Sequence, residues 1–145
     1  MADILETLLA QTGRYAGSQT DPNEEHPSDG LGVIEVRGLP GGVGVSFDYE
    51  VLHADGTRPH QEHTVLVRTP AGLRLVVTHT HADVASFLAE EEPGYFTLLD
   101  ADEAPFPMAI RLEVPEKGRL VYSWSYGWAD RPMTVRDIGD LKLLS

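Results

Sequence analysis

A single stretch decides the fold class: Val121-Tyr122-Ser123-Trp124-Ser125-Tyr126-Gly127-Trp128. Its four large rings recur at every second position, which is the period of a β-strand, because successive side chains there point to opposite faces of a sheet. All four rings therefore belong to one face. Tyr and Trp also carry polar tips that a dry core leaves unpaired. The stretch indicates either a cavity wall or a strongly aromatic core, and the sequence leaves both open.

The rest of the chain alternates between short apolar segments and turn residues, which predicts a succession of strands. The expected strands are Arg14–Gln19, Leu31–Arg37, Val43–Leu52, Glu62–Thr69, Leu73–His81, Val84–Ala89, Gly94–Leu99, Pro107–Val114, Arg119–Trp128 and Met133–Leu143. A short helix precedes them, with Asp3 as its cap and an apolar stripe that includes Leu5 and Leu8. The polar segment Asp21–Asp29 reads as a mobile loop.

Glycine-containing turns fix the register of two hairpins. A three-residue loop that ends at Gly118 pairs Leu112 with Tyr122 and Ile110 with Trp124, so every apolar side chain of both strands shares one face. The same kind of loop at Pro70-Ala71-Gly72 pairs Val67 with Leu75, Val65 with Val77 and His63 with His79. In this register Leu66 and Val76 point outward, to the solvent side.

About ten hairpin-connected strands and one helix predict an all-β fold, a closed antiparallel up-and-down barrel that forms a single domain over residues 1–145. Barrels of this size can hold one small ligand. A two-sheet sandwich, filled by side chains, is the alternative.

The composition and net charge of the chain narrow the classes of function that it can have. The chain has no cysteine, so disulfides and thiol chemistry are excluded. Its net charge of −12 and pI of about 4.7 argue against nucleic acid and anionic membranes. No signal peptide or membrane-spanning run is present, so we expect a cytoplasmic protein. Hydrolase motifs are absent as well, which favours a binding protein over an enzyme.

Several segments resemble the calycin superfamily, which includes lipocalins, fatty-acid-binding proteins and nitrobindins. They are Gly13-Arg14-Tyr15-Ala16-Gly17, Asp55-Gly56 with His60-Gln61-Glu62, and Arg131-Pro132-Met133 with Asp140-Leu141. The nitrobindin branch and related small bacterial barrels of unknown function are the most similar. The resemblance implies a ten-stranded barrel with an apolar pocket. In nitrobindins a last-strand histidine ligates haem, and the matching position here is Arg136, which cannot ligate iron, so haem held in the family's way is not expected.

Three histidines form the most specific constellation. His79 and His81 alternate on one strand face, and the expected register brings His63 opposite His79. Three imidazoles on one face can bind zinc or another divalent ion. A polar patch that fixes the head group of a ligand is the more common role of such residues.

We therefore expect a small hydrophobic or amphipathic ligand inside the barrel. The lining predicted for it comprises Val65, Val67, Leu75, Val77, Ile110, Tyr122, Trp124 and Tyr126, with His63, His79 and Arg136 orienting the ligand. Two alternatives stay open. One is a metal- or haem-dependent enzyme that uses His63, His79 and His81, and the other is a filled barrel that binds a partner or forms a homodimer through an outer patch at Leu66 and Val76.

Overall fold

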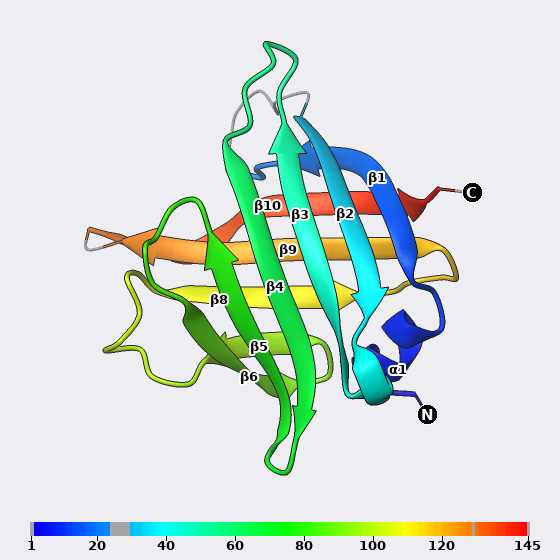
Figure 1. The fold of residues 1–145 in the computed structure, drawn as a ribbon. Coiled ribbons are helices and arrows are strands. Elements are labelled where there is room, and N and C mark those ends of the chain that lie inside the picture. Colours follow the sequence, from blue (N-terminus) through cyan, green and yellow to red (C-terminus); the bar gives the residue numbers. More distant parts are fainter. Residues whose placement is uncertain (1, 24–29, 129, 145) are drawn as a thin grey trace.

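Ten antiparallel strands close into a barrel in the computed structural model, which describes residues 2–23, 30–128 and 130–144 (Figure 1). The strands are β1 (Gly13–Thr20), β2 (Gly30–Gly38), β3 (Gly44–Leu52), β4 (His60–Thr69), β5 (Gly72–His79), β6 (Ser86–Glu92), β7 (Tyr95–Leu98), β8 (Met108–Glu113), β9 (Arg119–Trp128) and β10 (Arg131–Leu143). Each pairs with its neighbour in the chain, and β1 pairs with β10 to close the barrel. The predicted fold class is confirmed, and all ten expected strands are found.

The helix α1 (Ile4–Leu9) is also confirmed, and it covers one end of the barrel. Its cap forms as predicted, because the backbone N–H of Glu6 donates to Oδ1 of Asp3 at 2.8 Å. Leu5 and Leu8 are completely buried, and each such burial contributes roughly 1.5–3 kcal/mol. Beside them, a short 3₁₀ turn, η1 (Pro40–Gly42), leads from β2 into β3. No helix among the described residues is long and apolar enough to span a membrane.

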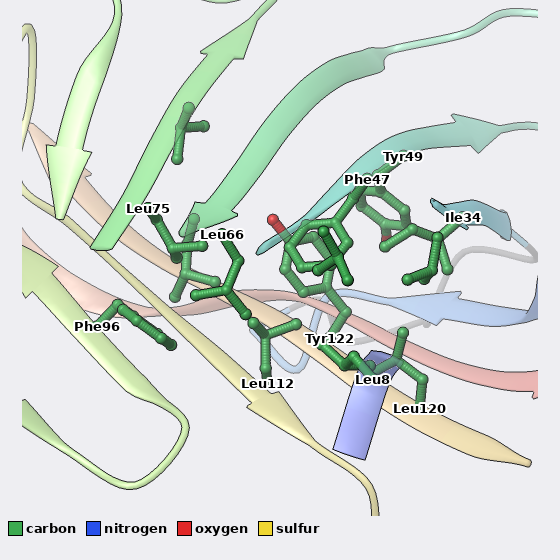
Figure 2. Close-up of a cluster of buried hydrophobic side chains, with 14 of the residues drawn as sticks. Leu8, Ile34, Phe47, Tyr49, Leu66, Leu75, Phe96, Leu112, Leu120 and Tyr122 are labelled. Carbon is green, nitrogen blue, oxygen red and sulfur yellow. The ribbon is translucent and has the colours of Figure 1, made fainter. Parts of the chain in front are cut away.

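The half of the interior next to α1 is filled by apolar side chains. Figure 2 shows Leu8 from α1 together with Phe47, Leu66 and Tyr122 from three strands in one cluster. The ring of Tyr122 contacts Phe47 at a centroid distance of 6.1 Å and Tyr49 at 5.0 Å. These contacts cross the barrel, so the aromatic strand β9 supplies much of the core.

The β8–β9 hairpin has the predicted register. Leu112 pairs with Tyr122, Ile110 with Trp124 and Met108 with Tyr126. The rings of β9 therefore face the interior, and Ser123 and Ser125 lie on the other face of the strand. The glycine turn before β9 was sufficient to set this register because it agrees with the apolar pattern of both strands.

The predicted register of the β4–β5 hairpin is wrong by one residue. Thr69 pairs with Gly72 across a two-residue loop, so Thr64 lies opposite Val77 and Glu62 opposite His79. Oγ1 of Thr69 holds this turn by donating to the carbonyl of Gly72 at 2.8 Å. The shift turns every side chain of β4 to the opposite face of the sheet.

As a consequence, Leu66 is buried in the core, and His63, Val65 and Val67 point out of the barrel. The alternation of β4 is clean in the observed register. An outer patch formed jointly by Leu66 and Val76 does not exist, because only Val76 belongs to the outer face.

Backbone geometry explains why glycine stands at both ends of the Gly13–Gly17 segment. A Cβ at Gly17 would lie 2.0 Å from the carbonyl oxygen of Asp140, so the closing strands β1 and β10 approach too closely for a side chain there. Gly13 has a φ of 137°, which favours glycine at the start of β1. Of the loop expected over Asp21–Asp29, residues 24–29 lie outside the described residues.

Candidate functional site

A cavity of about 550 Å³ opens at the end of the barrel opposite α1. Strand β4 runs from the cavity end of the barrel to the α1 end. It begins with His60 beside the cavity and ends beside α1, where Arg68 pairs with Asp3 at 3.0 Å. The cavity is lined by Gln19, Asp21, Val51, His53, Pro59, His60, His81, Pro105, Phe106, Trp124, Tyr126, Gly127, Trp128, Arg136 and Asp137. Aromatic rings and a few polar groups thus share one hollow.

The four rings of β9 run from the core to the mouth of this cavity. Tyr122 is completely buried, Trp124 is 2% exposed and Trp128 is 43% exposed, with Tyr126 partly buried between them. Phe106 extends the aromatic wall, with its ring 6.0 Å from that of Tyr126. Both interpretations of the aromatic stretch are therefore realised, since Tyr122 belongs to the core and the next three rings form a cavity wall.

A buried carboxylate, Glu62, lies beneath the cavity floor. Its Oε2 accepts hydrogen bonds from Oγ1 of Thr64 at 2.5 Å and from the hydroxyl of Tyr122 at 2.7 Å. Burial first, and then the negative charge of Glu62, raise the pKa of Tyr122 far above its usual range, so this phenol stays a donor. The indole N–H of Trp124 donates in turn to the Tyr122 hydroxyl at 3.2 Å. Glu62 is thus held in one orientation by neighbours on two strands.

The third partner of Glu62 is His60, whose Nε2 lies 2.8 Å from Oε1. Burial disfavours the imidazolium of His60, but the hydrogen bond and charge of Glu62, supported by Asp137, outweigh burial and raise its pKa. Glu62 is fully enclosed, whereas 10% of the His60 side chain stays accessible and lines the cavity. His60 therefore connects the enclosed carboxylate with the open space.

A second acid, Asp137, reaches the same cavity because β10 is irregular. The pairing with β9 shifts between Val135 and Asp137, which marks a β-bulge at Arg136. Oδ1 of Asp137 accepts from Nε2 of Gln19 and from the hydroxyl of Tyr49, both at 3.1 Å. Burial raises the pKa of Asp137 to about 6, although Gln19, His60 and Tyr49 oppose the shift.

Two further imidazoles stack against His60. Its ring lies 6.0 Å from that of His79 and 5.4 Å from that of His81. Burial, with the charge of His60, lowers the pKa of His79 to about 4, and the same two causes lower the pKa of His81. Nδ1 of His79 accepts the backbone N–H of His81, and its buried Nε2 has no partner among the described residues.

Arg136 lines the cavity beside the outermost rings of β9. Its Nε donates to the carbonyl of Tyr126 at 2.8 Å, and its guanidinium lies 4.6 Å above the ring of Trp128. A distance of this size is typical of a cation–π contact. Arg131 stacks on the same indole at 5.3 Å.

The structure brings only part of the predicted lining to this cavity. Trp124, Tyr126 and Arg136 line it, and His79 lies directly beside it, with its ring 5.1 Å from that of Trp124. His81, predicted only as a metal ligand, lines it as well. Four other predicted residues face the interior but belong to the filled half: Leu75, Val77, Ile110 and Tyr122. Val65, Val67 and His63 face outward because of the corrected register of β4.

The predicted convergence of His63, His79 and His81 is also wrong. His63 lies on the outer face, where its Nδ1 contacts Oδ1 of Asp48 at 2.7 Å. Within residues 2–23, 30–128 and 130–144, no three His, Asp or Glu side chains are arranged to hold a metal ion. The one-residue slip of the hairpin removed His63 from the group.

Sequence reasoning missed the central residues His60, Glu62 and Asp137. A signal for the first two exists, because His60-Gln61-Glu62 spaces them like neighbours on one strand face, with Thr64 and Leu66 continuing that face. The expected register, in which His63 faces inward, places Glu62 on the outer face of β4, because neighbouring residues of a strand point to opposite faces. Asp137 could not be found, since the bulge that turns it inward has no sequence signature of its own.

Comparison with known proteins supports the fold alone. No protein-family model matches the chain, and no curated protein matches it. Among solved structures, the crystal structure of Rv2717c from M. tuberculosis is similar, with a TM-score of 0.70 over 99% of this chain and 100% of that chain. The two sequences are 17% identical. The protein thus shares its overall fold with a bacterial protein of known structure.

Proposed function

We propose that the protein binds a small hydrophobic or amphipathic molecule in the open end of its barrel, in the manner of a calycin. The cavity carries this proposal. Its volume of about 550 Å³ lies within the range of small-molecule sites, which pair mostly apolar walls with a few polar groups. Here the rings of Phe106, Trp124 and Tyr126 supply the wall, and Arg136 and His60 supply polar groups.

The interior cavity is a better ligand site than the hollow of similar size on the outer face. That outer hollow, of about 590 Å³, is lined by charged residues that include Glu35, Asp48 and His63. Such groups are well hydrated in the free protein, so a ligand gains little by displacing water from them. The interior cavity offers aromatic surface, whose burial is favourable.

Ligand titrations monitored by tryptophan fluorescence test the proposal, because Trp124 and Trp128 both line the cavity. We expect saturable quenching by at least one of oleate, retinol, haemin and the neutral planar probe 7-methoxycoumarin. Mass spectrometry of an organic extract of the purified protein would identify a molecule that the barrel already carries. Absence of saturable binding for all four probes would overturn the proposal.

Two matched variants locate the site. Val51→Phe places a larger side chain in the cavity, whereas Val65→Phe makes the same change on the outer face. We expect Val51→Phe to weaken probe binding at least tenfold and Val65→Phe to leave it unchanged. Equal effects of both variants would contradict binding inside the barrel.

Neither alternative function is favoured by a specific observation. The three histidines proposed for a metal-dependent enzyme do not share one face, and the cavity does not favour a barrel filled by side chains. We also propose that the protein is a calycin and that it is located in the cytoplasm.

A further inference from the structure

We propose that His60 and Glu62 form an acid–base site for the ionisable hydroxyl group of a planar phenol or enol bound in the cavity. This inference rests on the proposed ligand-binding function and specifies the chemical class of the ligand. Its basis is the arrangement of a fully enclosed carboxylate, an imidazole that reaches from it to the cavity, and an aromatic wall that contacts this imidazole through Trp124.

The hydrogen bonds define which nitrogen of His60 can act. Glu62 accepts from Thr64 and Tyr122 and offers no proton, so Nε2 of His60 is the donor in the 2.8 Å contact with Oε1. In the neutral ring, Nδ1 is then a proton acceptor. Within the described part of the chain, Nδ1 has no hydrogen-bond partner, and the accessible part of the ring faces the cavity. An imidazole oriented by a carboxylate on one side and free on the other has the geometry of a general base.

Stability alone does not account for this pair. A buried ion pair contributes little compared with two apolar side chains of the same size, because both charges lose their hydration. The position of the pair at the cavity floor, with one member accessible, suits an interaction with a ligand.

The groups around His60 favour a bound anion next to a protonated ring. Glu62 on β4 and Asp137 on β10 stabilise the imidazolium, and Tyr49 on β3 donates its hydroxyl to Asp137. His79 and His81 follow on the other side, and for both of them burial and the charge of His60 favour the neutral form. One imidazolium is therefore stabilised among three stacked rings.

Arg136 supplies a second positive charge near the cavity. Besides His60, the other titratable lining groups are Asp21, His53, His81, Tyr126 and Asp137. The acids Asp21 and Asp137 disfavour a ligand with an extended anionic head. A single ionisable hydroxyl, which carries negative charge only when it faces His60, fits this mixed lining better.

The proposed step is a proton transfer within the complex. The O–H bond of the ligand breaks, an N–H bond forms at Nδ1 of His60, and the electron pair remains on the ligand oxygen. The Nε2–H of the new imidazolium stays hydrogen-bonded to Glu62. A planar ligand can spread the negative charge over its ring system while it stacks against Trp124 or Phe106.

The probe 7-hydroxycoumarin tests this step, because its neutral and anionic forms absorb at different wavelengths. Its ether, 7-methoxycoumarin, has the same shape and cannot ionise. We expect the pKa of the bound phenol to fall by about 1–3 units below that of the free probe, as for an acid next to a positive charge. Titration of the complex, followed by absorbance, measures the shift.

Variants of His60 and Glu62 test whether this pair causes the pKa shift of the bound phenol. Glu62→Gln keeps the size of the side chain but removes the charge that stabilises the imidazolium, and His60→Gln removes the base, so both should abolish most of the shift. His63→Gln is the matched control, since His63 forms a similar pair with Asp48 on the outer face, and it should leave the shift unchanged.

A measurement on the unmodified protein guards against variants that fail to fold. In ¹⁵N NMR of the imidazoles, the titration midpoint of His60 should rise when 7-hydroxycoumarin is bound and stay constant with 7-methoxycoumarin. If both coumarins bind without any change in the pKa of the phenol or of His60, the inference is overturned and the ligand-binding function stands. If neither coumarin binds while oleate or retinol does, the inference is overturned in the same way. Failure of every probe overturns both.

Discussion

Strand β4 contributes the histidines of two histidine–carboxylate pairs on opposite faces of the sheet, with Glu62 from β4 itself and Asp48 from β3. His60 contacts Glu62 at 2.8 Å inside the barrel, and His63 contacts Asp48 at 2.7 Å outside it. The contacts are nearly equal in length, but the side chains of the inner pair are 10% and 0% exposed and those of the outer pair 53% and 47%. Water solvates the outer pair, whereas protein groups must satisfy the inner one. The same two residue types therefore form a surface contact in one place and a candidate functional site in the other.

The largest expected difference between the pairs is in stability. Glu62→Ala leaves the imidazolium of His60 and the hydroxyls of Thr64 and Tyr122 without their common acceptor. We expect this variant to lower the free energy of unfolding by about 3–5 kcal/mol, as for a broken buried pair. Asp48→Ala should cost less than about 1 kcal/mol. Urea denaturation of both variants measures the two values, and equal losses would refute the distinction.

Asp137→Asn should change the pH dependence of stability. The pKa of this acid is raised from 3.8 to about 6 in the folded protein, so between these values the folded state binds more protons than the unfolded state. Rising pH in this window therefore lowers the stability contributed by Asp137, by up to about 3 kcal/mol at 1.36 kcal/mol per pKa unit.

The asparagine keeps an acceptor for Gln19 and Tyr49 but cannot ionise. Relative to the unmodified protein, the variant should gain stability as the pH rises from about 4 to 7. Urea midpoints measured across this range provide the test. The control is Asp48→Asn on the outer face, and a variant at position 137 that behaves like this control would be evidence against the raised pKa.

His79→Gln should have an effect of the opposite sign in an overlapping window. Because the pKa of His79 falls from 6.5 to about 4, the folded state binds fewer protons than the unfolded state between these values. Acidification from pH 7 to pH 4 therefore destabilises the unmodified protein through His79. Over this range the His79→Gln variant should lose roughly 1–3 kcal/mol less free energy of unfolding than the unmodified protein. Thermal unfolding at both pH values, with His63→Gln as control, measures the difference. Identical acid sensitivity with and without His79 would contradict the prediction.

The smallest expected effect is the coupling of the outer pair. A double-mutant cycle with His63→Gln and Asp48→Asn should give a coupling energy of about 0–1 kcal/mol near neutral pH, because both side chains are solvated. The value should fall further in about 1 M salt, which screens exposed charges. A salt-resistant coupling of several kcal/mol would show that exposure does not separate the two pairs.

The β8–β9 and β4–β5 hairpins show how far local patterns reach. In β9 the rings, the intervening serines and the glycine turn all favour one register, and that register is confirmed. In β4 both faces carry apolar residues, Val65 and Val67 on one and Leu66 on the other, so the pattern does not decide between them. The predicted turn was one residue too long, and His63 was placed inside instead of Glu62 and Thr64.

The sequence by itself determined the strands, the capped helix, the barrel class and the inward face of β9, because these follow from periodicities and turns within short segments. Tertiary structure alone decided the candidate site. Glu62 can be buried only because Tyr122, distant in the chain, offers its hydroxyl across the barrel, and Asp137 turns inward only through the bulge at Arg136. The free energy of a buried charge depends on partners that the closed barrel brings together, and no local pattern records them.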